Sequence, residues 1–163
     1  MAHEVSRRSV VTALGALGVA AASGALALVA PRRADAQALG VHESVQDGLK
    51  RVFGSRAIKD GAGLVKLDVP AIAENGAVVP VSVEVSSPMT PAAHVRSIWI
   101  VADRNRIPIV ARATLAPDAG QAFVAANIRL GESGDVRAIV EQSDGTLLAV
   151  KREVKVTVGG CGG

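Results

Sequence analysis

The sequence predicts an all-β fold: an immunoglobulin-like antiparallel β-sandwich with a short N-terminal helix and a flexible C-terminal Gly-Gly-Cys-Gly-Gly arm. Three observations support this prediction. Apolar and polar residues alternate in about seven segments after Gly63, and residues typical of turns separate these segments at fairly regular intervals. One earlier segment instead has the spacing of a helix.

The helix is expected over residues 40–54. Four apolar residues recur there at i, i+4, i+7 and i+8, which places their side chains on one helix face. They are Val45, Leu49, Val52 and Phe53. Gly54 follows directly, and glycine commonly ends a helix.

Seven strands are expected from the period of two in the later segments. They cover residues 65–69, 79–85, 95–102, 107–115, 121–130, 134–142 and 146–158. Pro80 lies in the second of them. Because proline cannot donate a ladder hydrogen bond, that strand is expected at a sheet edge.

Local signals predict the connections between these strands. Asn-Gly at 75–76 marks a tight turn, and Ser-Asp-Gly at 143–145 is a strong hairpin signal between the last two strands. Residues 89–94 are expected to form a short helical turn, with Thr90 as its cap and Pro91 in its first position.

The expected core consists of Val, Ala, Ile and Leu, and its aromatic residues are Phe53, Trp99 and Phe123. Trp99 is expected to pack in this core, with a partner interface as the alternative. Nothing in such a core indicates a pocket for a large cofactor.

The first 36 residues have the order of an export signal. Arg7 and Arg8 form a twin-arginine pair, an apolar run covers residues 10–30, and a small-x-small site ends at Ala36. The arginine pair indicates the twin-arginine route into the periplasm, with cleavage before Gln37. An ordinary Sec signal is one alternative. A retained membrane anchor is another, since about 20 apolar residues could span a bilayer.

Three domains follow: a cleaved signal at 1–36, a β-sandwich at 37–158 and an arm at 159–163. Four arginines and two acidic residues leave with the signal, which reduces 18 basic and 15 acidic residues to 14 and 13. No basic stripe with interleaved aromatic residues remains, so neither nucleic-acid binding nor membrane association after cleavage is expected. The remaining chain of about 127 residues is enough for one core.

No metal site is expected. The histidines and the cysteine of the mature chain are His42, His94 and Cys161, and no two of them have the spacing of a ligand motif. A structural zinc site would need four ligands. His94 is expected to be a surface or packing residue.

A catalytic centre is not expected either. The sequence has no nucleophile-elbow motif and no glycine-rich phosphate loop. Four carboxylates lie on expected turns and solvent faces, where solvated charge is their expected role: Glu74, Glu84, Asp103 and Glu141.

Cys161 is the single cysteine, third from the C-terminus, so no internal disulfide can form. In an exported protein such a residue indicates intermolecular pairing or a free reactive thiol. The sheet is expected to end near Val158, and the glycines after it to form a free tail. No basic residue flanks Cys161 to lower its pKa, so the thiol is better suited to being handled by other enzymes than to catalysis. A frayed terminus without a role is the alternative.

Three segments of the chain resemble the SoxY family, the sulfur-carrying subunits of the bacterial thiosulfate-oxidising Sox system. They are residues 67–90, 95–111 and 140–163, the last of which ends with GGCGG after EVKVTV.

The resemblance implies a non-catalytic carrier. Cys161 would be the attachment point for sulfur, and Gly159, Gly160, Gly162 and Gly163 would be its arm. No cofactor is implied beyond the sulfur bound covalently to Cys161. The implied stable partner is a SoxZ-like subunit, and the implied transient partners are a SoxAX cytochrome, a SoxB hydrolase and a sulfane dehydrogenase or sulfur-transfer protein.

Two other function classes stay open from the sequence. A thiol redox enzyme would need a second nearby cysteine or a basic flank. A structural β-sandwich module would be cross-linked by an intermolecular disulfide of Cys161, a bond that an unloaded carrier could also form.

Overall fold

The computed structural model describes residues 42–160. These residues belong to one compact unit, Ala38–Gly163. Outside the described residues lie the predicted signal and cleavage residues and the end of the predicted arm: Arg7, Arg8, Ala36, Gln37, Cys161, Gly162 and Gly163.

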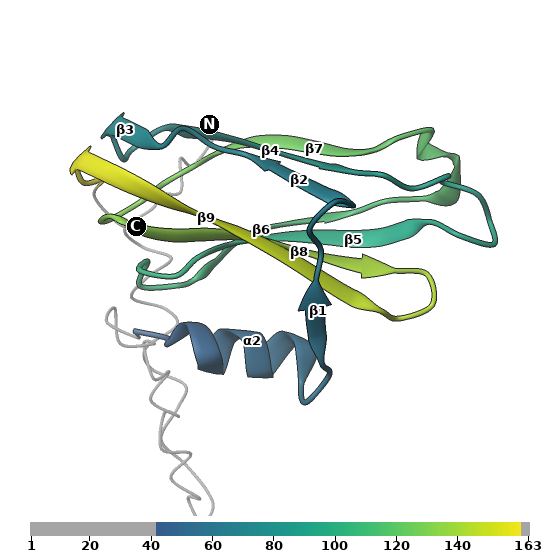
Figure 1. Cartoon of the computed structure of the whole chain (residues 1–163). Helices are drawn as coiled ribbons and strands as arrows, with labels where there is room; N and C mark the ends of the chain where they lie inside the picture. The colour runs from purple at the N-terminus through teal and green to yellow at the C-terminus, as the bar shows by residue number, and fades with distance from the viewer. Residues whose placement is uncertain (1–41, 161–163) are drawn as a thin grey trace, which may run out of the picture. The chain divides into compact units, whose positions relative to one another are not determined.

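The strands form two sheets that lie over one another (Figure 1). The larger sheet has the order β1 (Ile58–Asp60), β9 (Leu147–Val158), β8 (Gly134–Gln142), β5 (Val95–Ala102) and β6 (Ile109–Thr114), and β3 (Ile72–Asn75) also pairs with β9. The smaller sheet has the order β2 (Val65–Asp68), β4 (Val79–Val85) and β7 (Ala122–Ile128). A 3-10 turn, η1 (Pro117–Ala119), precedes β7. The predicted all-β sandwich is confirmed.

The core between the sheets comes from the alternation seen in the sequence. In β4, the four valines at alternate positions are 0–4% exposed, and the residues between them face outward or are half-buried. β5 differs because both of its faces are covered. Ile98 and Ile100 point into the sandwich, whereas Trp99 and Val101 belong to a second apolar cluster on the outer side.

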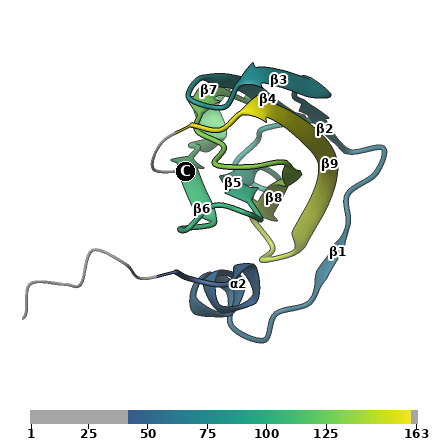
Figure 2. The ribbon, with the colours of Figure 1, turned by 90° about the vertical axis from the view of Figure 1, so that its left-hand side faces the viewer.

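The helix α2 (Val45–Phe53) covers that outer side (Figure 2). Its apolar face packs on the second cluster, as the residue spacing predicted. Phe53 meets Trp99 edge to face, with ring centroids 4.9 Å apart and an interplanar angle of 77°. Trp99 is therefore a core residue, and 4% of it is exposed.

Both ends of this helix follow the rules of capping. Ser44 Oγ accepts a hydrogen bond from the Asp47 amide. Gly54 ends the helix with φ at 63°, a conformation that favours glycine. In the described residues 42–160, no helix has the length and apolar character needed to cross a membrane.

β1 and β3 were not predicted. Both pair in parallel with β9, β1 at its first residues and β3 at its last. β9 curves from the side of α2 toward β3 (Figure 2), so it links the region under the helix to the opposite end of the sandwich. The predicted hairpin between β8 and β9 is confirmed, and Gly145 in its turn has φ at 85°.

The edge position predicted for the strand of Pro80 was wrong. β4 is the central strand of the smaller sheet, between β2 and β7. Pro80 fits there because β2 pairs with β4 only as far as Ser82. At Pro80 the strand has a paired neighbour on the β7 side alone, so no donor is missing on the other side.

Two further local predictions were wrong. Residues 91–93 form a bend and no helix is present over 89–94, although the Ala93 amide does donate to the Thr90 carbonyl oxygen at 3.1 Å and to Thr90 Oγ1 at 3.2 Å. Phe123 is not in the core. It lies on the outer face of β7 and is 46% exposed.

Candidate functional site

The candidate site is the point where the chain leaves the sandwich toward Cys161. β9 ends at Val158, as the sequence predicted. The next two residues do not leave the domain: Gly159 is exposed but Gly160 is buried. The Gly160 amide donates a hydrogen bond to the Leu130 carbonyl oxygen at 2.9 Å.

Backbone hydrogen bonds join three segments at this point. Besides the Gly160 bond, the Gly76 amide donates to the Val158 carbonyl oxygen at 2.7 Å, and the Leu130 amide donates to the Gly76 carbonyl oxygen at 2.7 Å. The turn after β3, the loop after β7 and the end of β9 are thus tied to one another without any side chain.

Glycine is required here by lack of space. A Cβ atom on Gly76 would lie 2.2 Å from the Leu130 oxygen, one on Gly159 would lie 2.3 Å from the Gly131 oxygen, and one on Gly160 would lie 2.6 Å from the Gly76 oxygen. None of these three has a positive φ. We call this contact of Gly76, Leu130, Gly131, Gly159 and Gly160 the glycine clamp.

The glycine clamp changes the expectation of a free tail that begins at Gly159. Gly159 and Gly160 are held against the sandwich, so they do not lengthen the reach of the sulfur. Cys161 is the next residue. One residue adds only one Cα–Cα step of about 3.8 Å, whereas the free tail expected from Gly159 onward allowed for three extended residues, or roughly 10 Å.

Asn105 holds the loop that supplies half of the glycine clamp. Its Nδ2 donates to the Arg129 carbonyl oxygen at 2.7 Å, and its Oδ1 accepts from the Gly131 amide at 3.1 Å. These two groups flank Leu130 on either side. Asn105 is only 7% exposed, and nothing in the sequence distinguished it from other polar turn residues.

Exposed residues of both kinds flank the glycine clamp in the chain: the valines Val78 and Val158 and the charged Arg129 and Glu132. Val158 is 62% exposed and Val78 is 61% exposed. Val78 directly follows Ala77, whose Cα a Cβ on Gly160 would approach to 2.8 Å.

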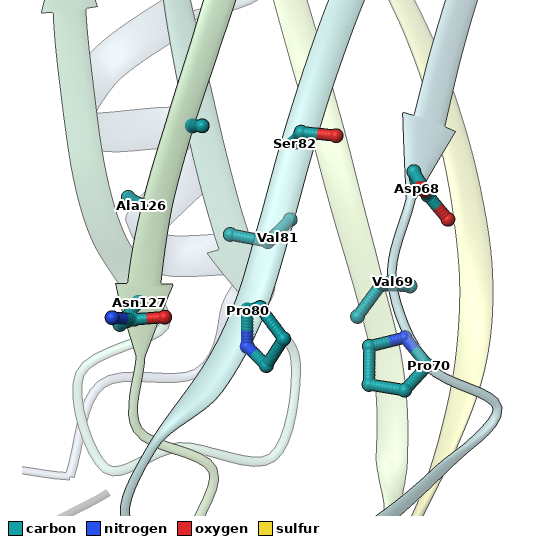
Figure 3. Close-up of a pocket in the computed structure, with 9 residues that line it drawn as sticks. Asp68, Val69, Pro70, Pro80, Val81, Ser82, Ala126 and Asn127 are labelled. Carbon is teal, nitrogen blue, oxygen red and sulfur yellow. The ribbon is translucent and has the colours of Figure 1, made fainter.

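An open groove of about 390 Å³ lies on the outer face of the smaller sheet, where β2 parts from β4 (Figure 3). Pro70 and Pro80 face each other across it, and Ser82 and Asn127 add polar groups. Its one charged lining residue is Asp68. A carboxylate repels anions, so this groove does not suit a sulfur oxyanion.

Basic residues do line a second hollow, of about 520 Å³, between α2 and the larger sheet: Lys59, Arg137 and Lys151. Two of them are neutralised by ion pairs. Lys151 Nζ lies 2.7 Å from Asp135, and Asp103 binds Arg137 with both oxygens, a contact that raises the pKa of the guanidinium. The hollow lies toward the start of β9, away from Gly160.

The other residues singled out in the sequence do not come together. His42 is exposed, and His94 is half-buried with its Nδ1 3.1 Å from the Thr90 carbonyl oxygen. Among residues 42–160, no group of three or more His, Cys, Asp or Glu side chains could hold a metal ion.

The expectation of solvated charge holds for Glu74 and Glu84, which are exposed. It was wrong for the other two carboxylates. The Asp103 side chain is 14% exposed and paired with Arg137, and the Glu141 side chain is 16% exposed and lies 2.6 Å from Arg56. Each pair ties a turn or loop to β8.

Comparison with known proteins identifies the family. The family model described as "Sulfur oxidation protein SoxY" matches residues 49–161, which is more than half of the chain and ends at Cys161. The chain belongs to the SoxY family. No curated protein sequence matches it.

Solved structures agree with this assignment. The structure of the sulfur carrier protein SoxY from Chlorobium limicola f thiosulfatophilum is 31% identical in sequence, with a TM-score of 0.58. The match covers 71% of this chain and 97% of that one. Nearly the whole of that solved protein therefore has a counterpart in this chain.

Superoxide reductases share the fold as well. The neelaredoxin from Ignicoccus hospitalis is 21% identical, with a TM-score of 0.51, and the match covers 57% of this chain and 80% of that one. A variant of the same neelaredoxin is 20% identical, with a TM-score of 0.52 over 70% and 93% of the two chains. At this level of identity the likeness concerns the fold alone.

Proposed function

We propose that this protein carries sulfur bound covalently to Sγ of Cys161 and presents it to the enzymes of thiosulfate oxidation. The observation that carries the proposal is the SoxY family match, which runs through residue 161 and so includes the single cysteine of the chain. The hydrogen bond from Gly160 to Leu130 supports it, because this bond holds the chain in place directly before the cysteine.

The chemistry proposed at Cys161 has two steps. In the first, the thiol loses its proton, a sulfur–sulfur bond forms to the outer sulfur of thiosulfate, and two electrons pass to a SoxAX cytochrome. In the second, water attacks the sulfonate sulfur in a SoxB hydrolase, sulfate and a proton leave, and Cys161 keeps a persulfide. Persulfides are reversible cysteine modifications, as a carrier requires.

The proposed role is that of a substrate-bearing subunit and not of an enzyme. The oxidant and the hydrolytic site belong to its partners, and a sulfane dehydrogenase or sulfur-transfer protein would remove the remaining sulfur. A SoxZ-like subunit is the proposed stable partner. We place the mature protein, from Gln37 onward, in the periplasm after export by the twin-arginine route, on the strength of Arg7 and Arg8.

The test is an intact-mass measurement on protein from the periplasmic fraction of thiosulfate-grown cells, with and without reductant. We expect an N-terminus at Gln37 and reductant-labile adducts on Cys161 with the mass of a thiosulfonate group or of added sulfur. Cys161→Ser should lack these adducts and should abolish growth on thiosulfate, whereas Ser97→Ala, on β5, should retain both.

The contrary outcome is equally clear. If the wild-type protein has a bare or merely disulfide-linked Cys161, and Cys161→Ser cells still oxidise thiosulfate, the carrier function is rejected. A β-sandwich module cross-linked by a disulfide would then describe the protein better.

A further inference from the structure

Asn105 is the buried polar residue nearest to the exit of the chain. It is 7% exposed, and the other buried polar side chain in the described part of the chain, Ser97, lies on β5. Burying an amide is costly unless its hydrogen bonds are made. Both ends of the Asn105 amide are bonded, one to Arg129 and one to Gly131.

The two bonds of Asn105 fix the orientation of Leu130. They hold the backbone groups immediately before and after it, and Leu130 itself supplies the carbonyl that accepts from Gly160 and the amide that donates to Gly76. The loop that Asn105 binds is therefore the one that is hydrogen-bonded to both other segments of the glycine clamp.

The turn that bears Asn105 is anchored independently of the glycine clamp. The Asn105 amide donates to the Ala102 carbonyl oxygen, and the Asp103 amide donates to the Asp135 carbonyl oxygen at 3.0 Å. Asp103 also binds Arg137 on β8 with both carboxylate oxygens. Asn105 thus connects a firmly held turn to the loop on which Gly160 depends.

We propose that Asn105 is a positioning residue for the carrier arm: through Leu130 and Gly131 it holds the glycine clamp, which fixes the point from which Cys161 leaves the domain. Gly159 and Gly160 are then held with the domain and are not part of a free arm. This inference rests on the proposed function in one respect, the benefit of a fixed departure point to an enzyme that must find Sγ.

A fixed departure point matters because reaction rates depend steeply on position. Placing the reacting atoms correctly supplies a large part of an enzyme's rate, and a misplacement of about 1 Å can cost on the order of a hundredfold. With Gly160 held, the sulfur can reach only the small volume that one residue allows. With Gly159 and Gly160 released, it would sample a much larger one.

The first experiment tests whether the Gly160 hydrogen bond forms, and it requires no sulfur chemistry. Amide hydrogen exchange is measured by NMR on the reduced mature protein. We expect the Gly160 amide to exchange at least about tenfold more slowly than those of Gly162 and Gly163, because a hydrogen-bonded amide must open first. Equal rates for the three amides would overturn the inference.

The second experiment removes Asn105. Asn105→Ala should abolish most of the Gly160 protection and should speed the motion of a nitroxide attached to Cys161, while Ser97→Ala, the other buried polar site, should change neither. Unchanged Gly160 protection in folded Asn105→Ala would contradict the positioning role.

A variant at the chain end covers the case in which Asn105→Ala does not fold. Gly160→Ala changes a residue beyond the end of β9, and its Cβ would lie 2.6 Å from the Gly76 oxygen. It should free the nitroxide at Cys161 as well, and Gly162→Ala serves as the matched control that should not. Equal spectra for Gly160→Ala and Gly162→Ala would refute the glycine clamp.

The third experiment connects the glycine clamp to function. Alkylation of Cys161 by iodoacetamide should stay within about twofold in Asn105→Ala, whereas conjugation of thiosulfate by the Sox cytochrome should slow about tenfold, the effect expected for about 1.4 kcal/mol. Unchanged conjugation in a protein that has lost its Gly160 protection would overturn the positioning role. Absence of thiosulfate adducts on wild-type Cys161 would instead reject the carrier function and leave the exchange results standing.

Discussion

The two ends of β9 are held in opposite ways. At its start, Leu147 belongs to the apolar cluster of Phe53, Trp99 and Ile139 under α2. Packing of side chains therefore stabilises this end of the strand. At its end, the glycine clamp joins backbone to backbone, and a single added Cβ would collide. One strand thus runs from a region stabilised by buried apolar area to one stabilised by close approach and hydrogen bonds.

This difference matches what each end has to do. Burial of large side chains contributes much stability, and stability is all that is required of the start of β9 under α2, which we call the helix end. The arm end must hold Gly160 and yet leave the residue after it accessible to other proteins. A backbone contact without side chains does this, since it adds little bulk around Cys161.

The strongest disruption of the helix end is Trp99→Ala. Removing a buried Trp side chain that packs edge to face on Phe53 should lower the free energy of unfolding by about 3–5 kcal/mol. Denaturant unfolding measures this directly. Phe123→Ala is the matched aromatic control, because Phe123 is 46% exposed and should contribute less than about 1 kcal/mol. Equal losses from both variants would mean that Trp99 is not a core residue.

The corresponding disruption of the arm end is Gly76→Ala. Its Cβ would lie 2.2 Å from the Leu130 oxygen, so the loop must shift, at a cost of about 1–3 kcal/mol. The hydrogen-exchange protection of Gly160 should fall at the same time, because the same loop holds both residues.

Gly145→Ala sharpens this comparison. Gly145 has φ at 85° and no atom within 4 Å of an added Cβ, so its substitution should cost about 1 kcal/mol through backbone conformation alone. We expect Gly145→Ala to leave the Gly160 amide as protected as in the wild type. If it deprotects Gly160 as much as Gly76→Ala does, the loss reflects global stability and the glycine clamp has no local effect.

The helix end was largely predictable from the sequence, for a physical reason. Side-chain burial leaves a periodic pattern in the chain, so the spacing of Val45, Leu49, Val52 and Phe53 and the alternation of the valines in β4 located both the helix face and the core. β1 and β3 were missed because each is short and pairs only with β9, far away in the sequence.

The arm end was not predictable in the same way. A glycine can mean conformational freedom or a place where another backbone comes close, and composition does not distinguish these meanings. Gly159 and Gly160 suggested a free tail, but their neighbours Gly76, Leu130 and Gly131 come from other parts of the chain. Asn105 left no signal at all, since a turn asparagine is expected in solvent.

The smallest expected effect is a dependence of stability on pH at the start of β9, which the end of β9 should not share. In the turn before β9, Asp144 accepts hydrogen bonds from the Thr146 amide at 2.8 Å and the Thr146 hydroxyl at 3.0 Å. The amide bond is the main cause that lowers the pKa of Asp144 below the ordinary value of 3.8. A lowered pKa in the folded state means that the charged carboxylate adds stability above pH 3.8, and that this contribution is lost as the pH falls through the lowered value.

Asp144→Asn should therefore unfold at a slightly lower temperature than the wild type at pH 7, and the gap should close well below pH 3.8. The glycine clamp is built from backbone groups alone, so the nitroxide spectrum at Cys161 should be the same in Asp144→Asn and in the wild type at both pH values. A gap that stays constant with pH would show that the Asp144 charge is not what stabilises the turn. A changed nitroxide spectrum would show that the start and the end of β9 are coupled, contrary to the separation argued above.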